Sequence, residues 1–540
     1  MTDTINQSSA DEFSFDYIVI GAGSAGCVLA NRLSGDPSVS VCLIEGGGSD
    51  RSWQVRIPAG VMTLFGSKRY DYKFVGVPQK HLNDRCIGVN RGKGLGGSST
   101  INSMVYIRGS KRDYDQWAEL GCTGWSFEDV LPEFIALEDD QRRRNPAWHG
   151  SGGELSIDRP ADPCRLSRMF AAAGEHMELD ANEDFNTGHQ EGLGIYDVTQ
   201  KNGERWNANR AFIAPVRNRP NLTVLTGTEV LSLDITGKRV GGVNVERNGV
   251  AGHIACRGEV VVSAGAIASP RLLMASGIGD GGELKSLGID VQHHLPGVGK
   301  NLQDHIDCMV TVRSSSAVTQ GVSWKSLPQV LAAPFNYFIQ RKGLLTTNFA
   351  EAGGFARTLY ANEEPDIQFH FFPGYRSHRG RMFEFGHGYA LHTCVLRPRS
   401  TGTVSLADDG TRRNVLIDHN FLSDAQDAKV LIEGLKQARR LLASPAFDDV
   451  RGTEMLPGDH VQTDDEILAY LRDHASTVYH PVGTCKMGID ETAVVDPESL
   501  RVIGMENLCV ADASIMPRLI SGNTNAAAMM IGAKAAKMIL

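Results

Sequence analysis

A glycine-rich turn between an apolar run and a helical pattern constrains this chain most. Residues 16–20 are β-branched and apolar, residues 27–33 have apolar side chains at helical spacing, and the turn at 21–26 reads G-x-G-x-x-G. A second apolar run at 39–44 ends at Glu45, which completes a strand–helix–strand unit. Such a unit predicts a parallel sheet with a right-handed crossover and a dinucleotide site at its edge.

Each glycine of this turn has a physical role. Gly21 permits the tight turn, Gly23 lets the backbone approach a pyrophosphate, and Gly26 lets the helix pack closely on the strand. Glu45 stands where a carboxylate accepts hydrogen bonds from a ribose diol. A glycine turn selected only for packing is the alternative, but the whole unit favours a dinucleotide ligand.

A second glycine-rich segment favours FAD over NAD. Residues 88–98, GVNRGKGLGGS, are too rich in glycine for an element of their own, and we expect a loop over a ligand followed by a helix start at Ser99. Backbone N–H groups there suit a long cofactor whose phosphates and ribityl chain lie extended along the protein. A flexible surface loop is the alternative interpretation.

The remaining patterns indicate two interleaved domains. Buried strands, a hairpin and a helix continue the first unit, at 221–225, 259–263, 507–510, 240–245 with 251–256, and 525–540. Between about 310 and 465 the pattern changes to alternating strands such as 366–370 and 403–406, which is typical of an antiparallel sheet.

We therefore predict an α/β FAD-binding domain, Rossmann-like with a parallel sheet, interleaved with an α+β antiparallel-sheet substrate domain. The FAD-binding domain takes residues 1–160, 206–309 and 466–540, and the substrate-binding domain takes 161–205 and 310–465.

Composition narrows the partners and the compartment. A net charge of -9 excludes a nucleic-acid partner, which requires clustered Lys and Arg. The 10 cysteines are scattered singly, as expected of a protein in a reducing cytosol. The first residues lack a basic start and an apolar core, and no apolar run approaches the ~18 residues that span a bilayer. We expect a cytoplasmic protein without a transmembrane segment, and peripheral attachment at the inner membrane stays open.

Several longer motifs carry a family resemblance. They are RGKGLGGSSTIN at 91–102, SAGAIASPRLLMASGIG at 263–279, HPVGTCKMG at 480–488, ADASIMP at 511–517 and GNTN at 522–525. Together with the first glycine turn they resemble the glucose–methanol–choline (GMC) family of FAD oxidoreductases, in the family's order and over nearly the entire chain. Within that family the chain is most similar to bacterial alcohol dehydrogenases of alkane degradation and, next, to choline dehydrogenase. Both pass electrons to a membrane or soluble acceptor.

The resemblance implies a set of FAD contacts. The adenine half would contact Ser24, Ala25 and Glu45, with Val230 facing the adenine. The isoalloxazine end would lie against Gly97, Asn102, Ser103, Met104, Val105, Asp512 and Ala513. Further expected FAD-binding residues are Gly21, Gly23, Gly26, Arg91, Ala264, Asn523 and Thr524. Some family oxidases link the flavin covalently through a histidine at the position of Ile101, so here the FAD is expected to be non-covalent.

The resemblance also implies the catalytic residues. His480 of the HPVG motif corresponds to the family's acid/base, and Asn523 to its second catalytic position. An imidazole with an ordinary pKa of ~6.5 is well matched to removing a hydroxyl proton near neutrality. Asn523 can hold the same oxygen without competing for the proton. The expected reaction is oxidation of a primary alcohol to an aldehyde, with hydride transfer to flavin N5 and electrons passed on to a quinone-like or other non-NAD acceptor.

Other functions stay open at this stage. Choline dehydrogenase and an oxygen-using alcohol oxidase are alternatives within the family, and a non-redox flavin-containing lyase is an alternative of another class. A pyridine-nucleotide flavin reductase would ordinarily show a second strand–helix–strand unit built around G-x-G-x-x-G, or a redox cysteine pair. The glycine spacing recurs at 92–97 and 277–282, but without such a unit around it, and no C-x-x-C pair occurs. A serine hydrolase lacks support because no G-x-S-x-G elbow occurs.

Three further groups of polar residues have alternative interpretations. His293, His294 and His305 lack neighbouring ligands at metal spacing, so we expect no metal site and assign them surface or packing roles. Glu351 either faces the substrate cavity, where it could meet a cation such as choline, or is a structural carboxylate. The charged run at 138–144 is expected to be a solvated loop or the edge of a lid.

Overall fold

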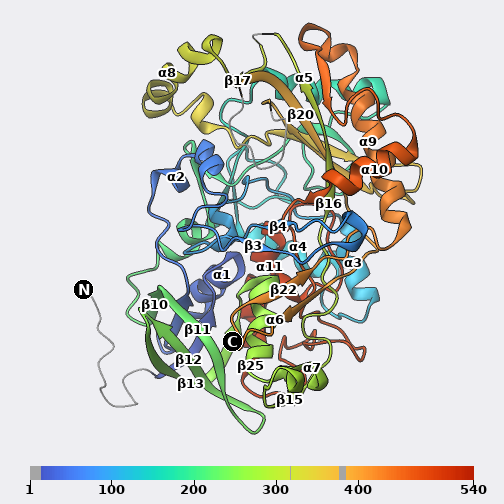
Figure 1. Ribbon diagram of the computed structural model, residues 1–540. Coiled ribbons are helices and arrows are strands. Elements are labelled where there is room, and N and C mark those ends of the chain that lie inside the picture. Colours follow the sequence, from blue (N-terminus) through green and yellow to red (C-terminus); the bar gives the residue numbers. More distant parts are fainter. Residues whose placement is uncertain (1–13, 317, 376–384) are drawn as a thin grey trace.

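Two large sheets organise the chain (Figure 1). The computed structural model describes residues 14–316, 318–375 and 385–540. A seven-stranded sheet occupies the lower half of Figure 1, and an eight-stranded sheet occupies the upper half. Each sheet has its own apolar core, so the molecule consists of two packed units joined along their inner faces.

The core of the first sheet is parallel, as predicted. Strands β1 (Ser14–Ile20), β2 (Val41–Glu45) and β10 (Leu222–Thr226) lie in the order β10-β2-β1, and β1 also pairs in parallel with β13 (Val250–Val262). Strand β25 (Leu508–Val510) pairs in parallel with the end of β13. All five residues of β2 are buried, which is typical of a parallel strand covered on both faces.

Strand β13 joins two elements that the sequence predicted separately. Its first half pairs with β12 (Arg239–Arg247), which continues the antiparallel meander from β11 (Thr228–Thr236), and its second half pairs with β1. A Cβ at Gly258 would lie 2.5 Å from the Asp16 carbonyl oxygen. The two strands that the sequence predicted on either side of Gly258 therefore form one continuous strand. Gly258 lies where this strand comes close to the backbone of Asp16.

Three helices connect this sheet to the site. Helix α1 (Ser24–Leu33) follows β1, α6 (Gly265–Ala275) follows β13, and α11 (Asn525–Ile539) packs against α1. A Cβ at Gly532 of α11 would lie 2.5 Å from the Ala25 carbonyl oxygen, so the glycine permits the two helices to approach closely. The predicted C-terminal helix is confirmed.

The second sheet is antiparallel in the pairs formed by its strands, as predicted. Its order is β23-β16-β20-β19-β18-β7, with β17 beside β20 and β24 beside β16. These strands are β7 (Gly192–Ile195), β16 (Ile306–Arg313), β17 (Gln320–Val322), β18 (Ala352–Ala356), β19 (Ile367–Phe372), β20 (Gly386–Val395), β23 (Thr453–Leu456) and β24 (Ser476–Thr477). Helices α5 (Arg165–Ala172) and α9 (Ala425–Leu442) pack on it.

Shorter elements complete the fold. The remaining α-helices are α2 (Trp53–Arg56), α3 (Lys111–Glu119), α4 (Phe127–Leu137), α7 (Gly281–Ser286), α8 (Leu327–Phe335) and α10 (Asp464–His474). Small strand pairs are β3 (Phe74–Val75) with β4 (Gly88–Val89), β5 (Glu138–Asp140) with β6 (Leu155–Ile157), β8 (Gln200–Lys201) with β9 (Glu204–Arg205), β14 (Ile278–Gly279) with β15 (His293–His294), and β21 (Thr403–Leu406) with β22 (Val415–Asp418). In the part of the chain that the structure describes, no helix has the length and apolarity needed to cross a membrane.

The predicted domain limits stay a prediction, and the packing of three elements differs from them. Helix α10 packs on α9 and β24 pairs with β16, although 466–540 was assigned to the first domain. The β21–β22 hairpin packs on α6 of the first unit, although 310–465 was assigned to the second. Local patterns identify these elements, but only the long-range apolar contacts decide which core each one joins.

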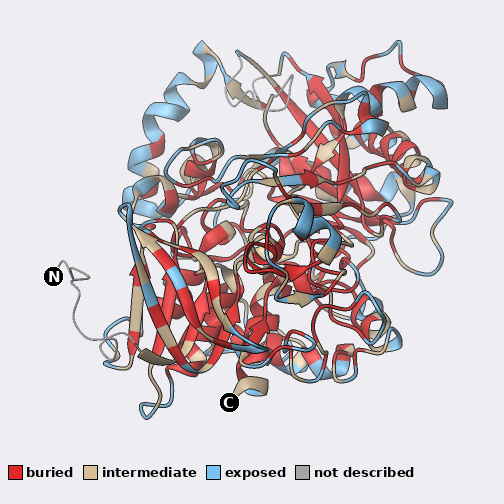
Figure 2. Cartoon of the chain, turned by 60° about the horizontal axis from the view of Figure 1, so that its bottom comes forward, coloured by how far each residue is buried: buried red, intermediate tan, exposed pale blue. Residues whose placement is uncertain are grey.

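Only the second half of the charged run at 138–144 is a solvated turn: Gln141 and Arg143 are exposed, whereas Glu138 and Asp140 are buried. The Arg108 and Glu138 side chains are 1% and 0% exposed and form an ion pair at 2.6 Å. His149 Nδ1 also lies 3.1 Å from Glu138, and Arg144 pairs with the buried Asp140 at 2.9 Å. In Figure 2 the interior around the two sheets is coloured mostly as buried. The ion pairs of Arg108 and Glu138 lie in this buried interior. A run of charges looks solvated in sequence because the partners that neutralise it lie elsewhere in the chain.

Candidate active site

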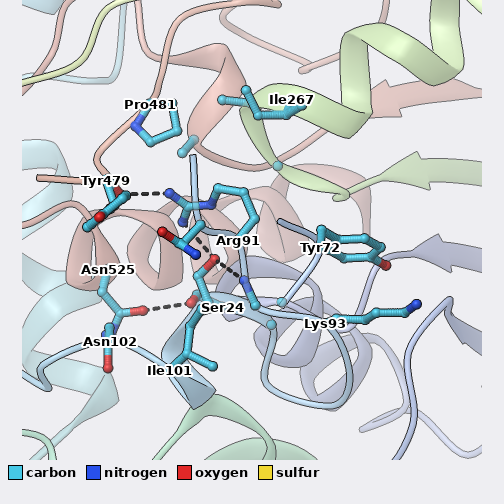
Figure 3. Close-up of a pocket in the computed structure, with 18 of the residues that line it drawn as sticks. Ser24, Tyr72, Arg91, Lys93, Ile101, Asn102, Ile267, Tyr479, Pro481 and Asn525 are labelled. Carbon is cyan, nitrogen blue, oxygen red and sulfur yellow. Dashed lines mark hydrogen bonds between the residues drawn. The ribbon is translucent and has the colours of Figure 1, made fainter. Parts of the chain in front are cut away.

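One large cavity lies between the two sheets. It has a volume of about 900 Å³ and is lined by both units: Ile20 and Ile44 come from the first sheet, and His370 and His392 from the second. Figure 3 shows the part of its wall where Ser24, Arg91 and Asn102 come together. A cavity of this size between two units is a typical site for a cofactor and a small substrate.

The structure brings nearly all the sequence-predicted site residues to this cavity. Those that line it are Gly21, Gly23, Ser24, Ala25, Glu45, Arg91, Gly97, Asn102, Ser103, Met104, Val105, Val230, Ala264, His480, Asp512, Ala513, Asn523 and Thr524. Gly26 is not part of the lining. A Cβ at Gly26 would lie 1.9 Å from the Gly21 carbonyl oxygen, so its role is the close packing of α1 against the turn.

The first glycine turn has the geometry of a cradle. Gly21 has φ +102°, and a Cβ there would lie 2.5 Å from the Ser263 carbonyl oxygen, so a side chain is excluded. A Cβ at Gly23 would meet no protein atom within 4 Å and would enter open space at the cavity wall. The missing side chain of Gly23 therefore leaves room for a ligand to touch the backbone.

Three helices begin at this cavity. The first residues of α1, α6 and α11 all line it, and the residue before each helix makes no side-chain capping bond. The Gly265 N–H of α6 donates to Asp512 Oδ2 at 2.8 Å, so α1 and α11 provide the uncapped N-termini. Uncapped N–H groups and the positive end of a helix dipole favour an anion. Lys93 and Arg271 line the same cavity and add positive charge. This donor set fits a diphosphate group.

Glu45 connects the two glycine-rich loops. Its carboxylate accepts hydrogen bonds from the backbone N–H groups of Ala22 at 3.0 Å, Gly47 at 2.7 Å and Gly94 at 3.0 Å. Burial raises the pKa of the Glu45 carboxyl above its ordinary value, and these bonds oppose that shift. The carboxylate retains lone pairs toward the cavity, so it can also accept a bond from a ribose hydroxyl.

The segment after the second glycine loop differs from the prediction. Instead of a helix starting at Ser99, the chain forms one 3-10 turn, Gly97–Thr100, and then runs on without a helix. Met104 has φ +60°, which is incompatible with helix continuation. Asn102 Oδ1 accepts hydrogen bonds from Arg205 Nη1 at 2.8 Å and from the Met104 N–H at 3.1 Å. The Asn102 side chain is therefore held in place at the cavity wall (Figure 3).

Arg91 fixes the loop that carries His480. Its guanidinium donates to the Tyr479 carbonyl oxygen at 2.6 Å and to Ser98 Oγ at 2.6 Å (Figure 3). On the other side, the His480 N–H donates to Asp304 Oδ1 at 2.8 Å. Tyr479 has φ +68°, a conformation that a bulky residue adopts only where its surroundings enforce it. The position of His480 is thus set by Arg91 of the second glycine-rich loop and by Asp304, which precedes β16.

His480 and Asn523 meet in the cavity, as the resemblance implied. Asn523 Nδ2 lies 3.2 Å from His480 Nε2, and Asn523 Oδ1 accepts a bond from Gln368 Nε2 at 3.2 Å. On the opposite side of the imidazole, His480 Nδ1 lies 2.9 Å from His305 Nδ1. His305 is fully buried, which agrees with a packing role, and its contact with His480 places it directly behind the cavity.

The neighbours of His305 determine which nitrogen of His480 carries a proton. His305 Nε2 lies 3.2 Å from the Leu396 carbonyl oxygen, which can only accept, so Nε2 bears the hydrogen. Burial lowers the pKa of His305 to about 4, so its ring is neutral and Nδ1 is an acceptor. His480 Nδ1 must then donate to it. The lone pair of His480 is left on Nε2, which faces Asn523.

The surroundings also keep His480 neutral. Burial lowers the pKa of His480 well below its ordinary value, and the nearby His305, His370 and Arg91 lower it further. Burial likewise lowers the pKa of His370 to about 4. A neutral imidazole with a lone pair directed into a cavity is the form that a general base requires.

Sequence reasoning missed several residues at this end of the cavity. His370, His392 and Phe372 line it from neighbouring strands, and His392 Nδ1 is held by Asp307 Oδ2 at 2.8 Å. His370 and Phe372 lie two positions apart on β19 and so share a face, which is the one signal that could have indicated them. Glu351 lies outside the cavity lining and accepts bonds from Cys164 N and Ser167 Oγ, each at 2.8 Å. It is a structural carboxylate.

Comparison with known proteins shows the family. A profile described as GMC oxidoreductase matches residues 15–307, and a second with the same description matches residues 398–532. The chain is a GMC oxidoreductase. It is 44% identical over 528 residues to an alcohol dehydrogenase [acceptor] of Pseudomonas putida, covering 97% of this chain and 96% of that one. It is 40% identical over 527 residues to an oxygen-dependent choline dehydrogenase of Sinorhizobium fredii, covering 97% and 95%.

Solved structures show the same fold. A pyridoxine 4-oxidase from Mesorbium loti superimposes with a TM-score of 0.86 at 30% identity, covering 97% of this chain and 98% of that one. A variant formate oxidase of Aspergillus oryzae superimposes with a TM-score of 0.89 at 26% identity, covering 98% of each chain. This GMC oxidoreductase is accordingly an FAD-dependent enzyme that oxidises CH–OH groups. The helix N-termini and the glycines that line its cavity fit that cofactor.

Proposed function

We propose that this GMC oxidoreductase oxidises an apolar primary alcohol to its aldehyde, holds FAD without a covalent link, and passes electrons to a quinone-like acceptor. The observation that carries the proposal is the lone pair of His480 Nε2, directed into the cavity and flanked by Asn523 at 3.2 Å. The acceptor is inferred from the similarity to an alcohol dehydrogenase [acceptor]. FAD supplies the hydride acceptor when bound.

In this mechanism His480 and Asn523 have different roles at the substrate oxygen. The alcohol hydroxyl donates its proton to His480 Nε2, and Asn523 Nδ2 turns from His480 to donate to the same oxygen. As the proton transfers, Asn523 and the positioned imidazole keep the oxygen in line for loss of the α-hydrogen. Gln368 holds the Asn523 amide from behind through Oδ1 at 3.2 Å.

His305 prepares His480 for this step. It accepts the Nδ1 hydrogen of His480 at 2.9 Å and thereby holds the ring in the tautomer whose Nε2 is free. After proton transfer the His480 imidazolium still donates to His305 Nδ1, so the new charge is stabilised by a short hydrogen bond. Because burial disfavours a charged imidazole, release of the proton is favoured once the aldehyde leaves.

The cavity wall near His480 supports an apolar alcohol. Phe349 and Phe372 line it and stack on one another with ring centroids 6.4 Å apart, and Phe65 and Met62 line it as well. Aromatic faces can also contact a cation such as choline, but an unengaged carboxylate would be the feature that favours a cation over a neutral alcohol. Glu351 is engaged outside the cavity, and Asp307 is held by His392.

The non-covalent link is supported by the side chain at the position where relatives carry a histidine. Ile101 lines the cavity there, and an alkyl side chain cannot form a bond to the flavin. A covalent link through another residue is the alternative that extraction of the cofactor tests.

Anaerobic mixing tests the proposed chemistry. The purified holoenzyme is mixed with primary alcohols of increasing chain length and, separately, with choline, and the flavin absorbance is followed. We expect apolar primary alcohols to bleach the flavin and choline to do so far more slowly. Faster reduction by choline would replace the substrate proposal with choline oxidation, and no bleaching by any alcohol would favour a non-redox role for the flavin.

A further inference from the structure

Several of the most exposed apolar side chains that the structure describes gather on one short helical segment. Helix α8 (Leu327–Phe335) and the π-helical turn that follows it, Asn336–Gln340, bury almost nothing except Ala333 and Tyr337. Their exposed apolar residues, with Trp324 just before them, are Trp324, Leu327, Val330, Leu331, Phe335, Phe338 and Ile339, here called the α8 patch. Trp324 is 82% exposed and Leu331 is 72% exposed. Isolated exposed apolar residues are ordinary, but a contiguous group of this kind marks an interaction surface.

The α8 patch has the form of an amphipathic surface helix. Leu327, Leu331, Phe335 and Phe338 follow one another at spacings of four, four and three residues, which places them along one face. The segment stands at the periphery of the molecule, at the upper left of Figure 1 and distant from the C-terminus, and the pale blue helix at the upper left of Figure 2 is its exposed surface. Among residues 14–316, 318–375 and 385–540, no other segment covers this face enough to bury its apolar side chains.

The charges around the α8 patch indicate what it binds. Residues 308–350 contain no Asp or Glu, whereas the whole chain has a net charge of -9. Lys325 and Lys342 stand at the two ends of the patch and are exposed, whereas the neighbouring Arg341 pairs with Glu204 at 3.3 Å. An aromatic and aliphatic face flanked by cations fits the interface of an anionic bilayer. A second copy of the chain would present the same cations, so like charges would meet.

We propose that the α8 patch docks this protein on an anionic lipid surface, with its apolar side chains inserted among the lipid headgroups and its cations on the headgroup phosphates. The α8 segment contacts Leu344–Thr346, which in turn contacts Pro58–Thr63. Val61 and Met62 of that second segment line the active-site cavity, as does Phe349. Docking would therefore place a wall of the cavity beside the bilayer, where apolar alcohols and quinone-like acceptors dissolve.

Sedimentation with vesicles tests the proposal without any substrate, so its outcome is separate from that of the proposed chemistry. The holoenzyme is mixed with vesicles of phosphatidylcholine and phosphatidylglycerol in equal parts, and with vesicles of phosphatidylcholine alone. We expect binding to the anionic vesicles, and at least a tenfold weaker binding for the double variant Leu331→Glu/Phe335→Glu. The matched control Val250→Glu/Ile489→Glu changes two other exposed apolar residues and should bind as the parent does. Flavin content and alcohol-dependent bleaching of each variant report that it is folded.

Further measurements distinguish a lipid surface from a second copy of the chain as the partner of the α8 patch. Lys325→Glu/Lys342→Glu should lose the preference for anionic over zwitterionic vesicles. Light scattering of the free protein reports its oligomeric state. Vesicle binding by Leu331→Glu/Phe335→Glu equal to that of the parent would overturn the proposal. Parent protein that ignores both vesicle types would also overturn it, and a dimer dissociated by the same double variant would then identify a second copy as the occupant.

Discussion

At the scale of single residues, the chemistry depends on one lone pair. Leu396 fixes the hydrogen on His305 Nε2, and His305 fixes the hydrogen on His480 Nδ1. The lone pair therefore stays on His480 Nε2, beside Asn523 Nδ2. Each link is a hydrogen bond in which only one direction of donation is available. The base that we propose, His480, is thus prepared by His305 and Leu396, which lie behind it.

Removing the base should slow the chemical step and leave the cofactor bound. We expect His480→Ala to retain FAD and to lower the rate of anaerobic flavin reduction by ~100-fold or more, the usual range for loss of a general base. His480→Gln keeps a polar side chain but cannot accept the proton, so it should be similarly slow. Asn523→Ala should cost less because it removes an orienting bond. Stopped-flow reduction at saturating alcohol is the measurement, and parental rates in His480→Ala would assign the base to another group.

The pH dependence of reduction follows from the depressed pKa of His480. The base must be neutral, and because its pKa lies well below 6.5, it is neutral at and above that pH. The rate of flavin reduction should therefore rise with pH only in the acid range and be constant from about pH 6.5 upward. Stopped-flow rates across this range provide the check. A rate that still increases above pH 6.5 would indicate a base whose pKa is not depressed.

At the scale of elements, the β1–α1 turn uses its glycines for two different purposes. Gly23 leaves space at the cavity, whereas Gly26 lets α1 lie against Gly21. Glu45 then links this turn to the loop at 88–98 through Gly47 and Gly94. The dinucleotide end of the site is therefore formed by two loops that a single buried carboxylate holds together.

The two glycines should respond differently to the same substitution. Gly23→Ala adds a methyl group that meets no protein atom within 4 Å, so the apoprotein should keep its thermal stability while FAD binding weakens. Gly26→Ala places a Cβ 1.9 Å from the Gly21 carbonyl oxygen, and such overpacking costs ~1–3 kcal/mol of unfolding free energy. Thermal unfolding of the apoproteins and titration with FAD measure the two effects. Equal loss of stability in both variants would contradict this division of roles.

At the scale of the whole molecule, the cofactor site lies where two cores meet. The first sheet contributes the glycine turn and the helix N-termini, and the second contributes His370 and Phe372. A ligand in this cavity touches both units, so it binds only the assembled fold. Cofactor binding and global stability should therefore be coupled.

This coupling predicts how the protein responds to added and removed FAD. Acid precipitation should release all the yellow colour into the supernatant, because Ile101 offers no atom for a covalent link. Added FAD at about a hundredfold its Kd should stabilise the apoprotein by ~2.7 kcal/mol. Absorbance of the supernatant and the Tm with and without FAD are the measurements. Colour left in the pellet would show a covalent flavin.

The sequence by itself determined the parts of the site that local chemistry specifies. A strand, a G-x-G-x-x-G turn, a helix and a closing acid lie within 30 residues, and the backbone positions that need glycine are set by local sterics, so the cofactor end was predictable. The motifs around His480 and Asn523 likewise predicted, through the family they resemble, two residues that meet in the cavity, and their catalytic roles stay a prediction.

Only the tertiary structure decided how His480 is prepared and what surrounds it. His305, Gln368 and His370 reach the site from distant parts of the chain, and the contact of His305 with His480 could not be predicted because its partner lies 175 positions away. The first half of the charged run at 138–144 looked solvated for the same reason, since Arg108 pairs with Glu138 only in the fold. A hydrogen-bond or ion-pair partner leaves no local pattern in a sequence. Its identity is fixed by which buried surfaces meet, and that depends on the packing of the two cores.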